Sequence, residues 1–190
     1  MPYRTSVASL SEDAFRRLLD DNGILRPAAL TPPPRWGSYA VFAQRPDARL
    51  ELETMKRHAG RFFSAKIGIT VDKRYDDRGP LEVDAARFVV ATEDGTANGT
   101  RLCFARRTEP ADLDAAQAAE QAQGTSGLAL LAQRCPMVWL VVPETDDDHA
   151  ALTIATIFAS TLLGPILAPD GTAIFGVRTA RMKLEAQARH

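Results

Sequence analysis

The last third of the chain constrains the fold most, because its pattern alternates between segments typical of strands and of helices. Residues 137–142 form an apolar run of buried-strand length, and the acidic residues 144–148 follow it. Because the helix dipole favours negative charge at a helix N-terminus, we expect a helix over about 149–163. Gly164-Pro165 should end that helix, since proline cannot continue it.

A second strand and a basic helix complete this part of the chain. Asp170-Gly171 is a turn signal, and it introduces the apolar residues 172–177, where we expect a strand. We expect a last helix over about 179–188, with basic side chains along it. The strands before and after the apolar helix predict a C-terminal βαβ-like unit in which the two strands run parallel.

Earlier in the chain, three runs alternate apolar residues with other residues at every second position, which is typical of strands. They cover residues 66–72, 87–92 and 101–105. Asp-Gly and Asn-Gly pairs within residues 94–99 predict a hairpin between the second and third runs. A further strand is expected over 38–43.

The remaining segments predict helices and one extended arm. Helices are expected over 11–22, 46–58, 110–123 and 128–134, with Gly60 as the end of the second. The proline-rich residues 24–36 predict an extended arm or linker after the N-terminal helix. We therefore expect one globular domain over 1–190, of the α+β (or α/β) class. Its mixed sheet of about six strands contains an antiparallel meander, and helices pack on it.

Composition and charge exclude several classes of protein. The chain has 190 residues and a formal net charge of −1, so a nucleic-acid partner is not expected. Two cysteines are too few for a disulfide framework, and residues 1–6 lack an apolar signal core, so we expect a cytoplasmic location. Residues 150–167 are uncharged, but their hydroxyl side chains and Gly164-Pro165 favour a buried core helix over a membrane span.

The second face of the middle strands carries small, polar or basic side chains. On this assignment the face contains Lys66, Gly68, Thr70, Val89, Ala91, Arg101, Cys103 and Ala105. Such a face is solvated, meets another subunit, or lines a cleft, and its basic residues suit a small anionic ligand. Lys66 and Arg101 are therefore candidate ligand-binding residues.

Cys103 is the candidate nucleophile of the chain. A neighbouring Arg101 guanidinium would lower the pKa of its thiol, and His149 or His58 could serve as a partner base. No local nucleophile motif surrounds Cys103, however, and free cysteine is among the most buried residue types. Packing is therefore the preferred interpretation for Cys103, and also for Cys135, which precedes a proline.

His149, Thr153, Thr156 and Ser160 are spaced by four, three and four residues, so they lie on one stripe of the expected helix. This stripe is a candidate ligand-binding surface. In the preferred interpretation its hydroxyls bond to carbonyls one turn back along the helix. A contact between helices or subunits is a third possibility, because small residues allow close approach.

Three further motifs have ordinary structural interpretations. The acidic residues 146–148 before His149 are interpreted as a helix start capped by Asp146 or Asp148, so no metal site is expected. Residues 124–127, Gly-Thr-Ser-Gly, precede a helix and could hold a phosphate, but they lack the lysine of a phosphate-binding loop. A basic cluster surrounds two phenylalanines that we expect to enter the core; it comprises Lys56, Arg57, His58, Arg61 and Lys66.

No catalytic constellation is evident, and the cofactor is unknown. The preferred hypothesis is a non-catalytic protein that binds a small ligand, with a small anion as the candidate, or serves an accessory role, and that self-associates. One alternative is an enzyme for a small anionic substrate that uses Cys103 or His149 with Arg101. Another is an interaction module that docks through the arm at 24–36.

Overall fold

The structure is a computed structural model that describes residues 37–46, 49–69, 80–82, 85–145 and 148–187. Its main sheet contains β1 (Tyr39–Ala43), β3 (Ala65–Ile69), β5 (Ala85–Thr92), β6 (Asn98–Arg107), β7 (Met137–Val141), β8 (Ile166–Leu167) and β9 (Ile174–Phe175). The helices are α2 (Leu52–Phe63), α3 (Pro110–Gln123), α4 (Leu128–Gln133), α5 (His149–Leu162) and α6 (Val177–Gln187). Two further strands, β2 (Arg49–Glu51) and β4 (Pro80–Glu82), pair with each other in a separate small sheet.

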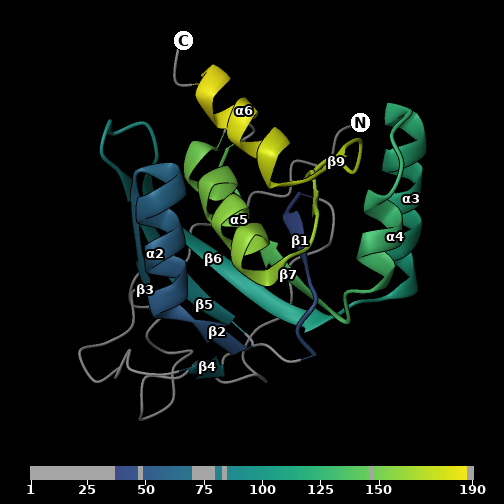
Figure 1. Cartoon of the computed structure of the whole chain (residues 1–190), viewed down its shortest axis with the longest axis horizontal. Helices are drawn as coiled ribbons and strands as arrows, with labels where there is room; N and C mark the ends of the chain where they lie inside the picture. The colour runs from purple at the N-terminus through teal and green to yellow at the C-terminus, as the bar shows by residue number, and fades with distance from the viewer. Residues whose placement is uncertain (1–36, 47–48, 70–79, 83–84, 146–147, 188–190) are drawn as a thin grey trace.

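Helices cover both faces of the main sheet, and the predicted α+β class is confirmed. The seven strands lie in the order β3-β5-β6-β7-β1-β8-β9. Helices α2, α5 and α6 lie together over one face, and α3 and α4 lie over the other (Figure 1). The larger core centres on Trp139, Phe88 and Phe158, whose rings meet edge to face at centroid separations of 4.9 to 6.4 Å.

The hairpin predicted from its turn residues is confirmed between β5 and β6. Its turn is held by Asp94, whose Oδ1 accepts hydrogen bonds from the backbone N–H and the hydroxyl of Thr96 at 3.1 and 2.7 Å. Gly95 has a φ of 74°, a left-handed conformation that glycine adopts without strain. The local sequence alone therefore determines this turn.

The register of the sheet corrects the predicted face of β6. Arg101 pairs with Phe88, and Cys103 pairs with Val141, so both point to the face covered by α2 and α5. Lys66 pairs with Ala91 and points to the opposite face. The prediction that one groove combines Lys66 with Arg101 is therefore wrong. A shift of one residue in the assignment turns every side chain of a strand to the other face.

The C-terminal unit contains the parallel relation that the sequence predicts, but with a different second strand. Both β7 and β8 pair antiparallel with β1, so they run in the same direction with β1 between them. The expected strand over 172–177 is reduced to β9, which pairs antiparallel with β8. Every neighbouring pair in the main sheet is thus antiparallel.

The helix expected over 46–58 begins and ends later than predicted. Strand β2 occupies residues 49–51, and α2 then runs through Gly60 to Phe63. Gly60 is therefore not the end of the helix. That role falls to Ser64, which has a left-handed φ of 48° and donates its N–H to the Ala59 carbonyl.

Replacing Gly60 by alanine should stabilise the protein by about 0.5–1 kcal/mol, since glycine weakens a helix interior. An added Cβ would meet nothing within 4 Å. The free energy of unfolding in urea measures the effect. Gly124 is the matched control, because it ends α3 with a φ of 62° and alanine there should cost about 1 kcal/mol. A Gly60→Ala variant less stable than the wild type would contradict the prediction.

Some predicted features lie outside the described residues, namely the helix over 11–22 and the arm over 24–36. The single-domain organisation over 1–190 stays a prediction. The expected core helix is confirmed, because α5 is buried at every residue from Ala150 to Ala159. Within the described ranges no helix has the length and apolar character that crossing a membrane requires.

Candidate functional site

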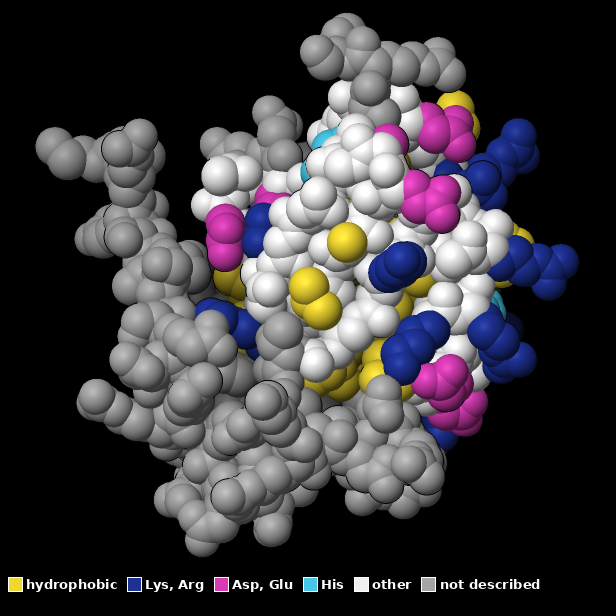
Figure 2. Space-filling view, turned by 90° about the vertical axis from the view of Figure 1, so that its left-hand side faces the viewer, with side chains coloured by type: hydrophobic (Ala, Val, Ile, Leu, Met, Phe, Trp, Pro, Cys, Tyr) yellow, Lys and Arg dark blue, Asp and Glu magenta, His cyan; other side chains and the backbone are white. Residues whose placement is uncertain are grey.

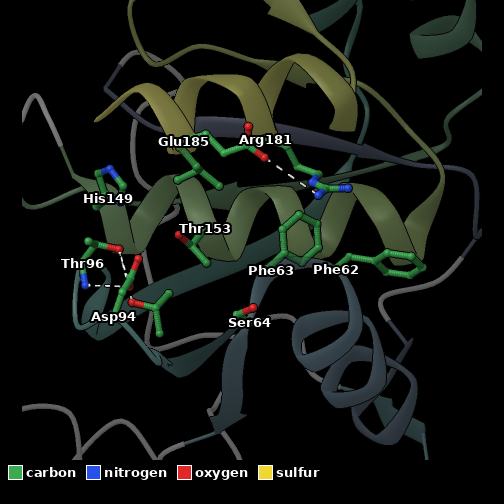
Figure 3. A pocket seen from close by; sticks show the side chains of 11 residues that line it. Phe62, Phe63, Ser64, Asp94, Thr96, His149, Thr153, Arg181 and Glu185 are labelled. Carbon is green, nitrogen blue, oxygen red and sulfur yellow. Dashed lines mark hydrogen bonds and ion pairs between the residues drawn. The ribbon is translucent and has the colours of Figure 1, made fainter. Parts of the chain in front are cut away.

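A groove opens where α2, α5, α6 and the turn between β5 and β6 meet (Figure 3). Its first part, the polar chamber, has a volume of about 260 Å³. The chamber is lined by Phe62, Phe63, Ser64, Thr92, Asp94, Thr96, His149, Thr153, Arg181, Leu184 and Glu185. Four separate segments thus bring charged and hydroxyl groups to one recess, next to two aromatic rings.

His149 and Thr153 come from the first turns of α5, and they are the residues that sequence analysis placed on one stripe. Both ring nitrogens of His149 are buried, and neither has a hydrogen-bond partner in the described part of the chain. Thr153 lies one turn further along and faces the centre of the chamber in Figure 3. The stripe therefore supplies polar atoms that the described structure leaves unsatisfied.

An ion pair below the chamber fixes the start of α5. Asp148 caps the helix, and its Oδ1 accepts the backbone N–H of Ala151 at 2.9 Å. Arg101 donates two hydrogen bonds to the same carboxylate, from Nε at 2.5 Å and from Nη2 at 3.0 Å. The side chain of Asp148 is only 1% exposed and that of Arg101 only 11%. This pair holds the adjacent His149 in place.

The same strand anchors a helix on the opposite face of the sheet. Arg106 of β6 donates to Asp112 in the first turn of α3 at 2.6 and 2.8 Å. Glu109 and Asp112 cap that helix reciprocally. Because β6 presents Arg101 to one face and Arg106 to the other, one central strand orients the N-termini of two helices.

The stability supplied by Asp148 should depend on pH. Burial alone raises the pKa of this carboxyl, but hydrogen bonds from Arg101 and from two backbone N–H groups outweigh burial and lower the pKa overall. Because the pKa is lower in the folded state, the ionised carboxylate stabilises the protein. This stabilisation is complete at pH values above the unfolded pKa, about 3.9, and it is lost as the pH falls through the folded pKa. The stability difference between wild type and Asp148→Asn, measured by urea unfolding, should therefore shrink below about pH 4. A difference that does not vary with pH would contradict this.

The second part of the groove, the apolar chamber, has a volume of about 490 Å³. Its walls are His58, Phe62, Phe63, Leu128, Leu131, Ala159, Ser160, Leu163, Gly164, Pro165, Gly176, Val177 and Arg181. Phe62, Phe63 and Arg181 line both chambers. The two chambers thus adjoin each other, with His149 in the polar one and Leu128 and Leu131 in the apolar one.

The remaining stripe residues have the structural role that was preferred. Thr156 is buried and donates its hydroxyl to the Leu152 carbonyl at 2.6 Å. Ser160 donates to the Ile157 carbonyl at 3.0 Å, and its oxygen lies 2.9 Å from Nδ1 of His58. Ser160 lines the apolar chamber, so the stripe contributes to both parts of the groove.

The chain was compared with protein-family models, with curated proteins and with solved structures. It matches none of them.

Cys103 and Arg101 do not join His149 in the groove. Cys103 is fully buried in the larger core, where burial raises the pKa of its thiol well above the usual value. The Arg101 guanidinium is held by Asp148 and lies 3.4 Å from Glu144. Burial also raises the pKa of the Cys135 thiol, to about 11. These features support the packing interpretation of both cysteines.

The possible phosphate site over 124–127 is occupied by a carboxylate of the protein itself. Glu120 accepts the backbone N–H groups of Leu128 and Ala129 at 2.6 and 3.1 Å. Those are the amides that would otherwise face an anion at the start of α4. Residues 124–127 thus separate α3 from α4, which agrees with the structural interpretation preferred from the sequence. Among the described residues, no cluster of three or more His, Cys, Asp or Glu side chains could hold a metal ion.

Four members of the basic cluster, Lys56, Arg57, His58 and Arg61, lie on α2, whereas Lys66 lies on β3. Figure 2 shows Lys and Arg side chains gathered on one side of the face that carries this helix. Arg57, Arg61 and Lys66 are exposed. Phe62 was expected to enter the core, but its side chain is 39% exposed. The Arg61 guanidinium lies 5.2 Å from the centre of the Phe62 ring. Phe63 packs partly buried against the core.

Sequence analysis missed the contributions of Asp94, Arg181 and Glu185 to the groove. Hydrogen bonds from Thr92 and Thr96 lower the pKa of Asp94 to about 2, so its carboxylate is charged. Arg181 and Glu185 are one turn apart on α6, with Nη2 and Oε1 3.9 Å from each other. That spacing was the one visible signal, and it marks a helix surface rather than a site.

Proposed function

We propose that this protein is a non-catalytic binding protein that holds a small molecule in the groove between α2, α5 and α6. The observation that carries the proposal is His149, whose two buried ring nitrogens have no partner among the described residues. Buried polar groups are nearly always hydrogen-bonded, because an unmade bond costs about 1–3 kcal/mol. A ligand in the polar chamber would supply the missing partner.

The size and composition of the groove support a small molecule. Ligand sites commonly occupy about 300–1,000 Å³ and combine apolar walls with a few polar groups. The apolar chamber falls within that range at about 490 Å³, and the polar chamber adjoins it. The enzyme alternative stays a prediction, since the chamber that holds His149 is not lined by Cys103 or Arg101.

Native mass spectrometry of the full-length protein, purified gently from its own host, tests the proposal. A retained small molecule in the wild type, released on denaturation, is the expected result. Ligand-free protein that also fails to bind any member of a metabolite mixture would overturn it. The same spectra report the number of subunits.

Replacing His149 by leucine should separate binding from stability. We expect retained ligand to disappear from the native mass spectrum. The free energy of unfolding of the ligand-free protein should rise by about 1 kcal/mol, because the change removes two unpaired buried nitrogens. His58→Leu is the matched control. Its ring nitrogen has a partner in Ser160, so this variant should lose stability. A His149→Leu variant that keeps the ligand would contradict the assignment.

Self-association and a cytoplasmic location complete the proposal. Leu130, Leu163 and Met182 are large apolar side chains that are 56–64% exposed, which supports a contact with another subunit. Two free, buried thiols are consistent with a reducing compartment. Docking through the arm at 24–36 stays a prediction, because the arm lies outside the described residues.

A further inference from the structure

We propose that the ligand of the groove is an amphipathic carboxylate, with its carboxylate in the polar chamber and an apolar chain of several carbons in the apolar chamber. This inference rests on the proposed function and names the chemical class of its ligand. It combines two independent observations, the set of hydrogen-bond donors at one end of the groove and the apolar walls at the other.

The polar chamber offers donors for an anion. Arg181 borders it with a permanently charged guanidinium, and His149 presents a ring N–H with no partner among the described residues. The Thr153 hydroxyl group lines the same chamber. A carboxylate accepts several hydrogen bonds at once, and such charge-assisted bonds are stronger than neutral ones.

The two acidic residues of the polar chamber are already engaged. Asp94 accepts two hydrogen bonds from Thr96 in its own turn. Glu185 lies 3.9 Å from Arg181, which leaves that guanidinium with donors to spare. In Figure 3 the guanidinium extends from α6 toward Phe63, and both of these residues line both chambers. A carboxylate placed there can accept hydrogen bonds from the guanidinium donors that Glu185 leaves free.

The apolar chamber suits a hydrocarbon chain, and its surroundings disfavour a ligand with a cationic head group. Leucine, phenylalanine, valine and proline side chains dominate its walls, and no acidic residue among the described ones lines it. Arg181 in its wall carries a positive charge, and Arg61 lies over the ring of Phe62, which also lines this chamber. Charge complementarity therefore selects an anionic head over an ammonium for a molecule whose tail fills this chamber.

A chain-length series on the full-length protein tests the inference. Isothermal titration with butyrate, hexanoate, octanoate and decanoate, each below its micelle concentration, should give affinities that rise with length. Each CH₂ group buried in the apolar chamber should tighten binding about fourfold. Decylamine, with the same chain and the opposite charge, should bind at least about tenfold more weakly than decanoate.

Matched variants locate the two ends of the ligand. Arg181→Gln should weaken decanoate about tenfold or more, whereas Arg178→Gln, on the same helix but outside both chambers, should not. Leu131→Gln should flatten the dependence on chain length, whereas the exposed neighbour Leu130→Gln should leave it intact. Thermal unfolding confirms that each variant is folded before titration.

The outcomes distinguish the class of ligand from the existence of the site. A molecule retained in native mass spectra, together with no binding of decanoate, would overturn the carboxylate and leave the binding function standing. If butyrate and decanoate bind with equal affinity, or if decylamine binds more tightly than decanoate, the ligand is not an amphipathic carboxylate. Decanoate binding that neither Arg181→Gln nor Leu131→Gln weakens would place the ligand elsewhere and overturn both proposals.

Discussion

Replacing Asp148 by alanine is expected to destabilise the protein by about 3–5 kcal/mol, the range for breaking a buried ion pair from one side. The change leaves Arg101, whose side chain is 11% exposed, without its bidentate partner. It also removes the cap of α5 and the acceptor for the Glu144 backbone N–H, which lies 2.7 Å from Asp148 Oδ2. Urea unfolding monitored by circular dichroism measures the loss.

Three variants separate the parts of this effect. Asp148→Asn keeps a capping side chain but no charge, so it should lose less stability than alanine does. Glu144→Gln removes an exposed partner of Arg101 and should change stability by less than about 1 kcal/mol. Adding Arg101→Met to Asp148→Ala should restore part of the loss, because the orphaned buried charge is removed. Strictly additive losses in this double variant would show that the orphaned charge is not the cause.

Much of the fold could be predicted from the sequence, because local patterns determine it. The hairpin follows from Asp94-Gly95, and α5 follows from an acidic start and a long apolar run. The failures have a physical cause. Alternation alone placed Arg101 on the same face as Lys66, but Arg101 points to the other face and pairs there with Asp148, which is 47 residues away in the sequence. The two-residue strand β8 is too short to produce any periodic signal.

Only the part of the candidate site on α5 could be predicted, because the spacing of residues along one helix is visible in the sequence. His149 and Thr153 share one stripe of α5, and that spacing identified them. The groove also needs Asp94 from a turn and Arg181 from another helix, and no local pattern connects these segments. A groove assembled from distant segments depends on tertiary packing, which the spacing of residues along one helix does not encode.

The end of α5 shows how a turn signal can hide a packing requirement. Gly164-Pro165 was interpreted as a helix terminator, and α5 does end just before it, at Leu162. The connection to β8 is also bonded closely to β1: the Phe42 N–H donates to the Pro165 carbonyl at 3.0 Å, and the Gln44 N–H donates to the Leu162 carbonyl at 3.1 Å. The two backbones therefore approach each other at Gly164.

Gly164→Ala should accordingly destabilise the protein by about 3 kcal/mol or more, because overpacking a closed core forces the backbone to shift. An added Cβ would lie 2.6 Å from the Phe42 carbonyl carbon and closer still to its oxygen, and neither atom can rotate away. Gly176→Ala is the matched control, since its Cβ would meet nothing within 4 Å and the change should stay within about 0.5 kcal/mol. Urea unfolding of both variants measures the contrast. If the two cost the same, the contact between Gly164 and β1 is not a constraint on the fold. If Gly164→Ala alone is costly, glycine is required here by the approach of β1 as well as by the end of the helix.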